Sequence, residues 1–160
     1  MSKNITLWRV ENEYGSGPYN GTGSIHEFLW GNYWRCGFDD WRCPRPWKDK
    51  ELSKIFATEA EFTTKKELRS AFSTAQQYQD WFSTEFVRNA LDATGFFLTR
   101  YDIEAENVHL GYRQSLFDPQ NATISAIGFC NRPEIITSRD QIEDDFIERF
   151  LERTLIDCSI

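Results

Sequence analysis

Residues 71–82 read AFSTAQQYQDWF, and this stretch marks the point at which an extended segment gives way to a helix. Ser73 and Gln76 have the spacing of a capping box, in which each side chain accepts a hydrogen bond from an otherwise unpaired backbone N–H. Aromatic side chains then recur at helical spacing, and these are Tyr78, Trp81 and Phe82. The stretch therefore predicts a helix from about residue 74 to residue 82 that buries an aromatic face.

The start of this helix has two interpretations. Ser73 and Thr74 would present hydroxyl groups and free backbone N–H groups to whatever lies in front of the helix. That neighbour is either a bound ligand or another part of the protein, and the local sequence is compatible with both.

Strand and helix patterns alternate irregularly along the rest of the chain. Strand-like runs occupy residues 5–10, 96–103, 108–110, 113–117 and 123–129. Short helices are expected between 49 and 69, a second apolar-striped helix between 83 and 95, and an amphipathic acidic helix over 138–157. Because strands and helices do not follow a strict βαβ order, we predict an α+β fold with a mixed or antiparallel sheet and several helices.

Length and composition indicate one compact domain spanning residues 1–160. The chain is 40% hydrophobic and 16% aromatic, with thirteen Phe and six Trp, which favours a core built on large rings. The net charge of −7 argues against direct binding to nucleic acid, since a phosphate backbone would repel it. We expect no membrane interaction and a cytoplasmic location, because no signal peptide and no membrane-spanning apolar run is present.

Metal binding is not expected. Cys36 and Cys43 are separated by six residues, whereas structural zinc ligands usually pair two to four residues apart. The chain contains two His, so few sets of ligands or catalytic pairs involving His can be assembled.

Residues 20–50 form a Trp- and Arg-rich insertion without a clear helical or strand period. Its candidate interaction residues are Trp34, Arg35, Trp41, Arg42 and Trp47. Aromatic and Arg side chains are typical anchors of protein interfaces, but they also form small satellite cores around ordered loops. Both interpretations remain open for this segment.

The acidic face of the 138–157 helix is a second candidate surface. Glu143, Asp144 and Glu148 lie on the side opposite the apolar residues. Such a face is either simply solvated or complementary to a basic groove on a protein partner. Together with the Trp/Arg insertion, it suggests a non-enzymatic acidic inhibitor or adaptor that binds a host protein complex. The composition also resembles that of small phage-encoded proteins, for which the location would be the host cytoplasm.

A third set of residues resembles the ADP-ribosyltransferase family. Arg9 lies on the first strand, Ser73 and Thr74 precede the aromatic helix, and Gln114 begins a late strand-like run. The resemblance implies that Arg9 contacts a phosphate of NAD, that Ser73 and Thr74 shape the nicotinamide side, and that residue 114 contacts ribose as the catalytic residue. The family has Glu where this chain has Gln114, so the resemblance implies an NAD- or nucleotide-binding domain in which catalysis is degenerate.

Overall fold

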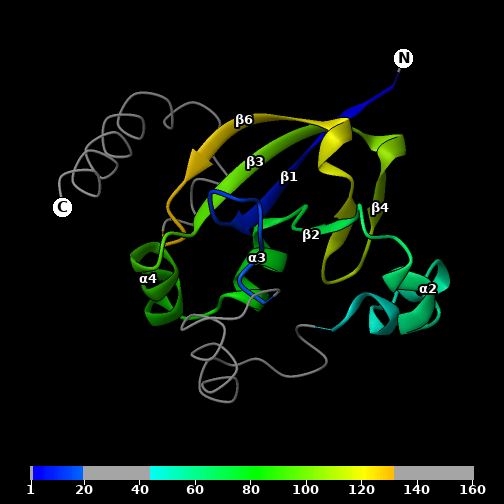
Figure 1. The fold of residues 1–160 in the computed structure, drawn as a ribbon, viewed down its shortest axis with the longest axis horizontal. Helices are drawn as coiled ribbons and strands as arrows, with labels where there is room; N and C mark the ends of the chain where they lie inside the picture. The colour runs from blue at the N-terminus through cyan, green and yellow to red at the C-terminus, as the bar shows by residue number, and fades with distance from the viewer. Residues whose placement is uncertain (1, 20–43, 132–160) are drawn as a thin grey trace.

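The computed structural model describes residues 2–19 and 44–131. Its larger sheet contains β1 (Asn4–Glu11), β3 (Phe97–Glu104) and β6 (Ala122–Gly128), with β3 in the middle and both pairings antiparallel. Alternation of apolar and polar side chains is only approximate in these strands, and β1 is buried on both faces from Leu7 to Glu11. Figure 1 shows the three strands as one twisted layer across the upper part of the molecule.

A smaller antiparallel sheet contains β2 (Arg69–Ala71), β5 (Ser115–Phe117) and β4 (Val108–Leu110), with β5 in the middle. It joins the larger sheet where Trp8 and Phe72 exchange two backbone hydrogen bonds of 2.8 and 2.7 Å. The start of α3 is thus fixed beside the middle of β1, and this junction positions the candidate site described below.

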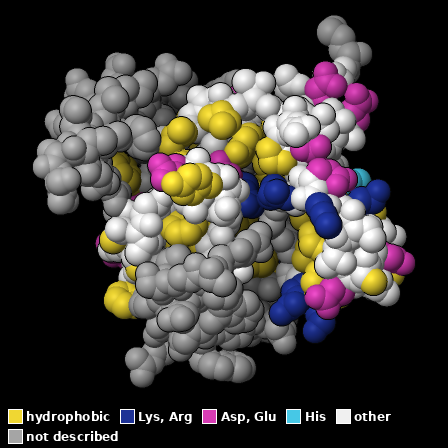
Figure 2. Space-filling view, viewed as in Figure 1, with side chains coloured by type: hydrophobic (Ala, Val, Ile, Leu, Met, Phe, Trp, Pro, Cys, Tyr) yellow, Lys and Arg dark blue, Asp and Glu magenta, His cyan; other side chains and the backbone are white. Residues whose placement is uncertain are grey.

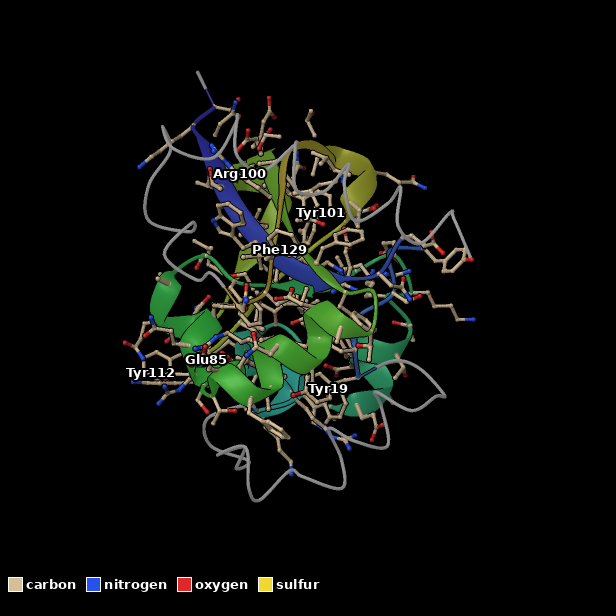
Figure 3. The ribbon with its side chains drawn as sticks, turned by 90° about the vertical axis from the view of Figure 1, so that its left-hand side faces the viewer. Tyr19, Glu85, Arg100, Tyr101, Tyr112 and Phe129 are labelled. Atoms are coloured by element: carbon tan, nitrogen blue, oxygen red, sulfur yellow. The ribbon has the colours of Figure 1, made fainter. Side chains whose placement is uncertain are left out.

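Helices α3 (Ala75–Trp81) and α4 (Glu85–Ala93) cover one face of the larger sheet. The core on this side combines buried side chains from both helices with those of the sheet: Trp8, Val10, Phe72, Tyr78, Phe82, Val87, Leu91 and Leu98. Phe129, which is partly buried, packs against this cluster and lies between the sheet and the helices in Figure 3. A second cluster, which includes Leu7, Tyr101 and Phe117, joins the two sheets.

Short helices complete the described part of the chain. They are η1 (Pro46–Lys48), η2 (Leu52–Lys54), α2 (Glu59–Thr63), η3 (Ala105–Asn107) and η4 (Pro119–Asn121). Asp49, which is fully buried, ties the first two to the β4–β5 turn. Its carboxylate accepts hydrogen bonds from the backbone N–H groups of Glu51, Leu52, Tyr112 and Arg113 at 2.7–3.2 Å.

The predicted α+β class is confirmed, and both observed sheets are antiparallel. The helix predicted from residue 74 is present, but its N-cap is Thr74 and not Ser73, because the Thr74 hydroxyl accepts from the Gln77 N–H at 3.1 Å. The apolar-striped helix predicted between residues 83 and 95 is present as α4, but its Phe86 is 65% exposed. The predicted helix over 138–157 and most of the 20–50 insertion lie outside the described residues.

Candidate active-site pocket

A pocket of about 360 Å³ opens between β1, β2 and the segment that follows α2. Its lining includes five basic side chains, Arg9, Arg45, Lys65, Lys66 and Arg69, and no Asp or Glu among the described residues. Figure 2 shows Lys and Arg side chains on one face of the molecule, interspersed with hydrophobic side chains and with Asp and Glu. In a protein with a net charge of −7, this local concentration of positive charge would attract an anion more strongly than a cation.

Aromatic side chains form the apolar part of the pocket. Five rings line it: Tyr19, Phe62, Phe72, Trp81 and Phe82. Phe72 and Phe82 are about 5% and 2% exposed, and their rings meet edge to face with centroids 5.9 Å apart. Tyr19 packs against Phe82 and Trp81 with centroid distances of 6.1 and 5.9 Å. The combination of rings and cations is suited to a flat organic ligand that carries negative charge.

Arg9 lies in the wall of the pocket and is only 4% exposed. Its Nε donates to Glu11 Oε2 at 3.0 Å, its Nη1 to the Ser70 carbonyl at 2.7 Å and its Nη2 to the Gly15 carbonyl at 3.2 Å. A Cβ at Gly17 would lie 3.1 Å from Nη2, so the loop covers the guanidinium closely. Burial lowers the pKa of Arg9 from its ordinary value, and the Glu11 carboxylate partly offsets this effect.

Glu11 is the only acidic partner of Arg9 among the described ion pairs, and it is also buried. Its other carboxylate oxygen accepts a hydrogen bond from the Tyr101 hydroxyl. Burial, followed by the hydrogen bond to Glu11, raises the pKa of Tyr101 above its ordinary value. Arg9, Glu11 and Tyr101 therefore form a closed polar cluster in which the opposite charges neutralise each other.

Gln114, the predicted catalytic residue, lies in the same pocket and is 1% exposed. Its carbonyl oxygen accepts a hydrogen bond from the Ser70 hydroxyl, and its amide nitrogen donates to the Pro44 carbonyl. Ser70 thus contacts Gln114 through its hydroxyl and Arg9 through its carbonyl. The structure therefore brings Arg9 and Gln114 together, with Ser70 as the link between them.

Ser73 and Thr74 do not line this pocket; their contacts are within the start of α3. The Ser73 hydroxyl and backbone N–H both donate to the side-chain oxygen Oε1 of Gln77, at 3.2 and 2.8 Å. The side-chain nitrogen Nε2 of Gln77 in turn donates to the backbone carbonyls of Gly111 and Tyr112. These residues fix α3 against the β4–β5 turn. The start of the helix therefore faces another part of the protein.

Sequence patterns did not indicate the basic residues of the outer pocket. Lys65 and Lys66 are exposed and form no ion pair among the described residues. Arg69 is half-buried and donates to the carbonyls of Lys66 and Leu68, while Arg45 lies 4.0 Å from Glu59. The one available signal was the basic run Lys65-Lys66 with Arg69 close behind it in an otherwise acidic chain.

Of the predicted interaction residues, the structure describes Trp47. Its half-buried ring lies 5.7 Å from the Phe62 ring, and the Arg45 guanidinium lies 5.6 Å from its centroid. The remaining residues of that set lie outside the described ranges: Trp34, Arg35, Trp41, Arg42, Glu143, Asp144 and Glu148.

Within residues 2–19 and 44–131, no group of three or more His, Cys, Asp or Glu side chains is arranged to hold a metal ion. None of the helices in these ranges has the length and apolar character needed to cross a membrane.

Comparison with known proteins identifies a phage family. No curated protein and no solved structure matches the chain, so these comparisons lend no support to the resemblance to ADP-ribosyltransferases. One family model, described as Bacteriophage T4 Y00F protein, matches residues 1–129. The match therefore extends from before β1 to one residue beyond the end of β6. Since it covers well over half of the sequence, the chain belongs to the family of the bacteriophage T4 Y00F protein.

Proposed function

We propose that this phage-family protein binds a small anionic ligand of the nucleotide class in the pocket between β1, β2 and α2. The observation that carries the proposal is the lining itself, which combines basic side chains and aromatic rings without an acidic residue among those described. Lys and Arg side chains hold phosphate groups, and aromatic rings pack against bases. NAD is the first ligand to test, because Arg9 and Gln114 share this pocket.

The proposal concerns binding and not group transfer. Gln114 carries no negative charge with which to stabilise an oxocarbenium-like transition state, in contrast to the Glu that the ADP-ribosyltransferase resemblance implies. One of the two N–H groups of its amide is directed to the Pro44 carbonyl.

Calorimetric titration of the full chain with NAD tests the proposal. The variant K65E/K66E should weaken binding at least tenfold, because it places two negative charges at the mouth of the pocket. The matched control is K3E/K54E, which makes the same change in net charge at positions outside the pocket lining. Absence of binding by NAD and by mononucleotides at millimolar concentration, or equal weakening by both double variants, would refute the proposal.

A second function, docking on a host protein in the host cytoplasm, is favoured by the distribution of charge. Residues 132–160 contain eight acidic and four basic side chains, so more than half of the net charge of −7 lies in this segment. Replacing Glu143, Asp144 and Glu148 together by Lys should abolish salt-sensitive retention of a host protein in a pull-down at low ionic strength. Unchanged retention of the same partner by this triple variant would contradict an electrostatic docking surface.

A further inference from the structure

The pocket changes from apolar at its inner end to positively charged at its outer end. Phe72 and Phe82, which are almost fully buried, form the inner apolar wall together with the partly buried Tyr19 and Trp81. Lys65 and Lys66 stand at the outer end and are exposed to solvent. A ligand that satisfies both ends therefore carries its flat apolar part inward and its charge outward, since an inward-facing charge would lose its hydration without gaining a partner.

The inner wall offers no second place for a phosphate. Arg9 is the one basic side chain among the lining residues that is nine-tenths or more buried. Three of its five N–H groups donate to protein oxygens, and Glu11 neutralises its charge. Positive charge that a ligand can engage is therefore confined to the outer end, at Arg45, Lys65, Lys66 and Arg69.

The size of the pocket agrees with this single charged end. Its volume of about 360 Å³ lies near the lower limit of the range of roughly 300–1,000 Å³ that is typical of small-molecule sites. That volume accommodates one base with its sugar, whereas a dinucleotide has two such units on either side of its phosphates. The second unit would remain outside the pocket, beyond the Lys65 and Lys66 side chains.

We infer that, within the proposed nucleotide-binding function, the pocket recognises a single mononucleotide unit, with its ring against Tyr19 and Trp81 and its phosphate at the Lys65–Lys66 mouth. The inference rests on the proposed function and specifies its ligand class. NAD then binds through one of its halves, and its other half contributes little to affinity.

The test compares five ligands by calorimetry on the full chain: NAD, adenosine monophosphate, nicotinamide mononucleotide, adenosine and inorganic phosphate. We expect one mononucleotide to bind within tenfold of the affinity of NAD. Adenosine and inorganic phosphate should each bind at least tenfold more weakly than that mononucleotide. K65E/K66E should weaken binding of the mononucleotide at least tenfold and change binding of adenosine less than threefold. K3E/K54E should leave the affinity for both ligands unchanged.

Three outcomes would overturn the inference while leaving the proposed function intact. NAD binding more than tenfold tighter than both mononucleotides would indicate a dinucleotide site. If wild type and K65E/K66E bind NAD and the mononucleotides equally well, and Tyr19→Leu in the aromatic lining loses binding, the phosphate lies away from the two lysines. Inorganic phosphate binding as tightly as the mononucleotides would overturn the role of the ring. If none of the five ligands binds, the proposed function itself fails.

Discussion

Polar side chains have opposite roles in the inner and outer parts of the pocket. In the inner part, Arg9 and Gln114 are buried and bonded to protein oxygens. In the outer part, Lys65 and Lys66 are exposed and have no acidic partner among the described residues. A buried charge must be compensated within the protein, whereas an exposed charge can keep its water until a ligand replaces it. The inner polar groups therefore build the pocket, and the outer ones are available for binding.

Replacing Glu11 by Ala should have the largest effect on stability. It leaves the buried Arg9 charge without its counter-ion and the Tyr101 hydroxyl without its acceptor. Removing one member of a buried ion pair typically costs about 3–5 kcal/mol in the free energy of unfolding. Urea denaturation measures this value. Glu51→Ala, which breaks the exposed pair with Lys54, should cost less than about 1 kcal/mol. Equal costs for the two variants would show that burial does not distinguish the two ion pairs.

Replacing Gln114 by Ala should have the next largest effect. The substitution leaves the Pro44 carbonyl and the Ser70 hydroxyl without the partners they have in the structure. Each buried polar group left unpaired costs about 1–3 kcal/mol, and relaxation of the neighbouring loop reduces the sum. Gln114→Glu should also destabilise, because a carboxylate cannot donate to the Pro44 carbonyl. The exposed Gln120 offers the control Gln120→Ala, and a cost no larger than that control would contradict a structural role for the amide.

The order of elements could be predicted from the sequence because long periodic segments dominate the fold. The predicted strand over 108–110 agrees with β4, and those over 5–10, 96–103 and 123–129 agree with β1, β3 and β6 to within one residue at each end. The short strand β2 was visible only as the end of an extended segment. Three residues carry too little pattern, and β2 forms because β5 supplies its hydrogen-bonding partner.

Helix caps show why local detail was harder to predict. Ser73-Thr74 and Ser83-Thr84 each offer two adjacent residues that can cap a helix, and the sequence pattern favours Ser73 in the first pair. The structure uses the second, Thr74 for α3 and Thr84 for α4. Ser and Thr have similar capping preferences, so tertiary packing decides where the backbone turns.

The candidate pocket was predictable only in part. The order of Arg9 and Gln114 in the sequence predicts that they share a site, and both line one pocket. Ser70 links them, whereas Ser73 and Thr74 lie at the start of α3. Lys65 and Lys66 lie far from Arg9 in the sequence. Their proximity depends on how the segment after α2 packs beside β2, which no local pattern encodes.

A rise in pH above 10 should reduce the stability that the Arg9–Glu11–Tyr101 cluster contributes to the fold. The pKa of Tyr101 is raised in the folded protein, whereas in the unfolded chain the phenol ionises near pH 10. The unfolded state then loses this proton first, so unfolding becomes more favourable as pH increases above 10. The contribution is about 1.4 kcal/mol per pH unit until the folded hydroxyl also ionises.

Urea denaturation of wild type and Tyr101→Phe between pH 8 and 11.5 measures this contribution. The variant is less stable at pH 8 because it lacks the hydrogen bond to Glu11, and its stability should fall less steeply above pH 10. Parallel pH profiles for the two proteins would show that Tyr101 ionises equally easily in the folded and unfolded states.

The smallest effect on stability is expected for Lys65→Gln combined with Lys66→Gln. Exposed side chains without ion-pair partners can be replaced at a cost within about 0.5 kcal/mol. The same substitutions should weaken nucleotide binding, and the loss should shrink as salt concentration rises because salt screens exposed charges. Denaturation and calorimetry on one protein sample therefore separate the two parts of the pocket. If this double variant lost stability as Gln114→Ala does, the outer lysines would also be part of the fold, and the contrast between the two ends of the pocket would disappear.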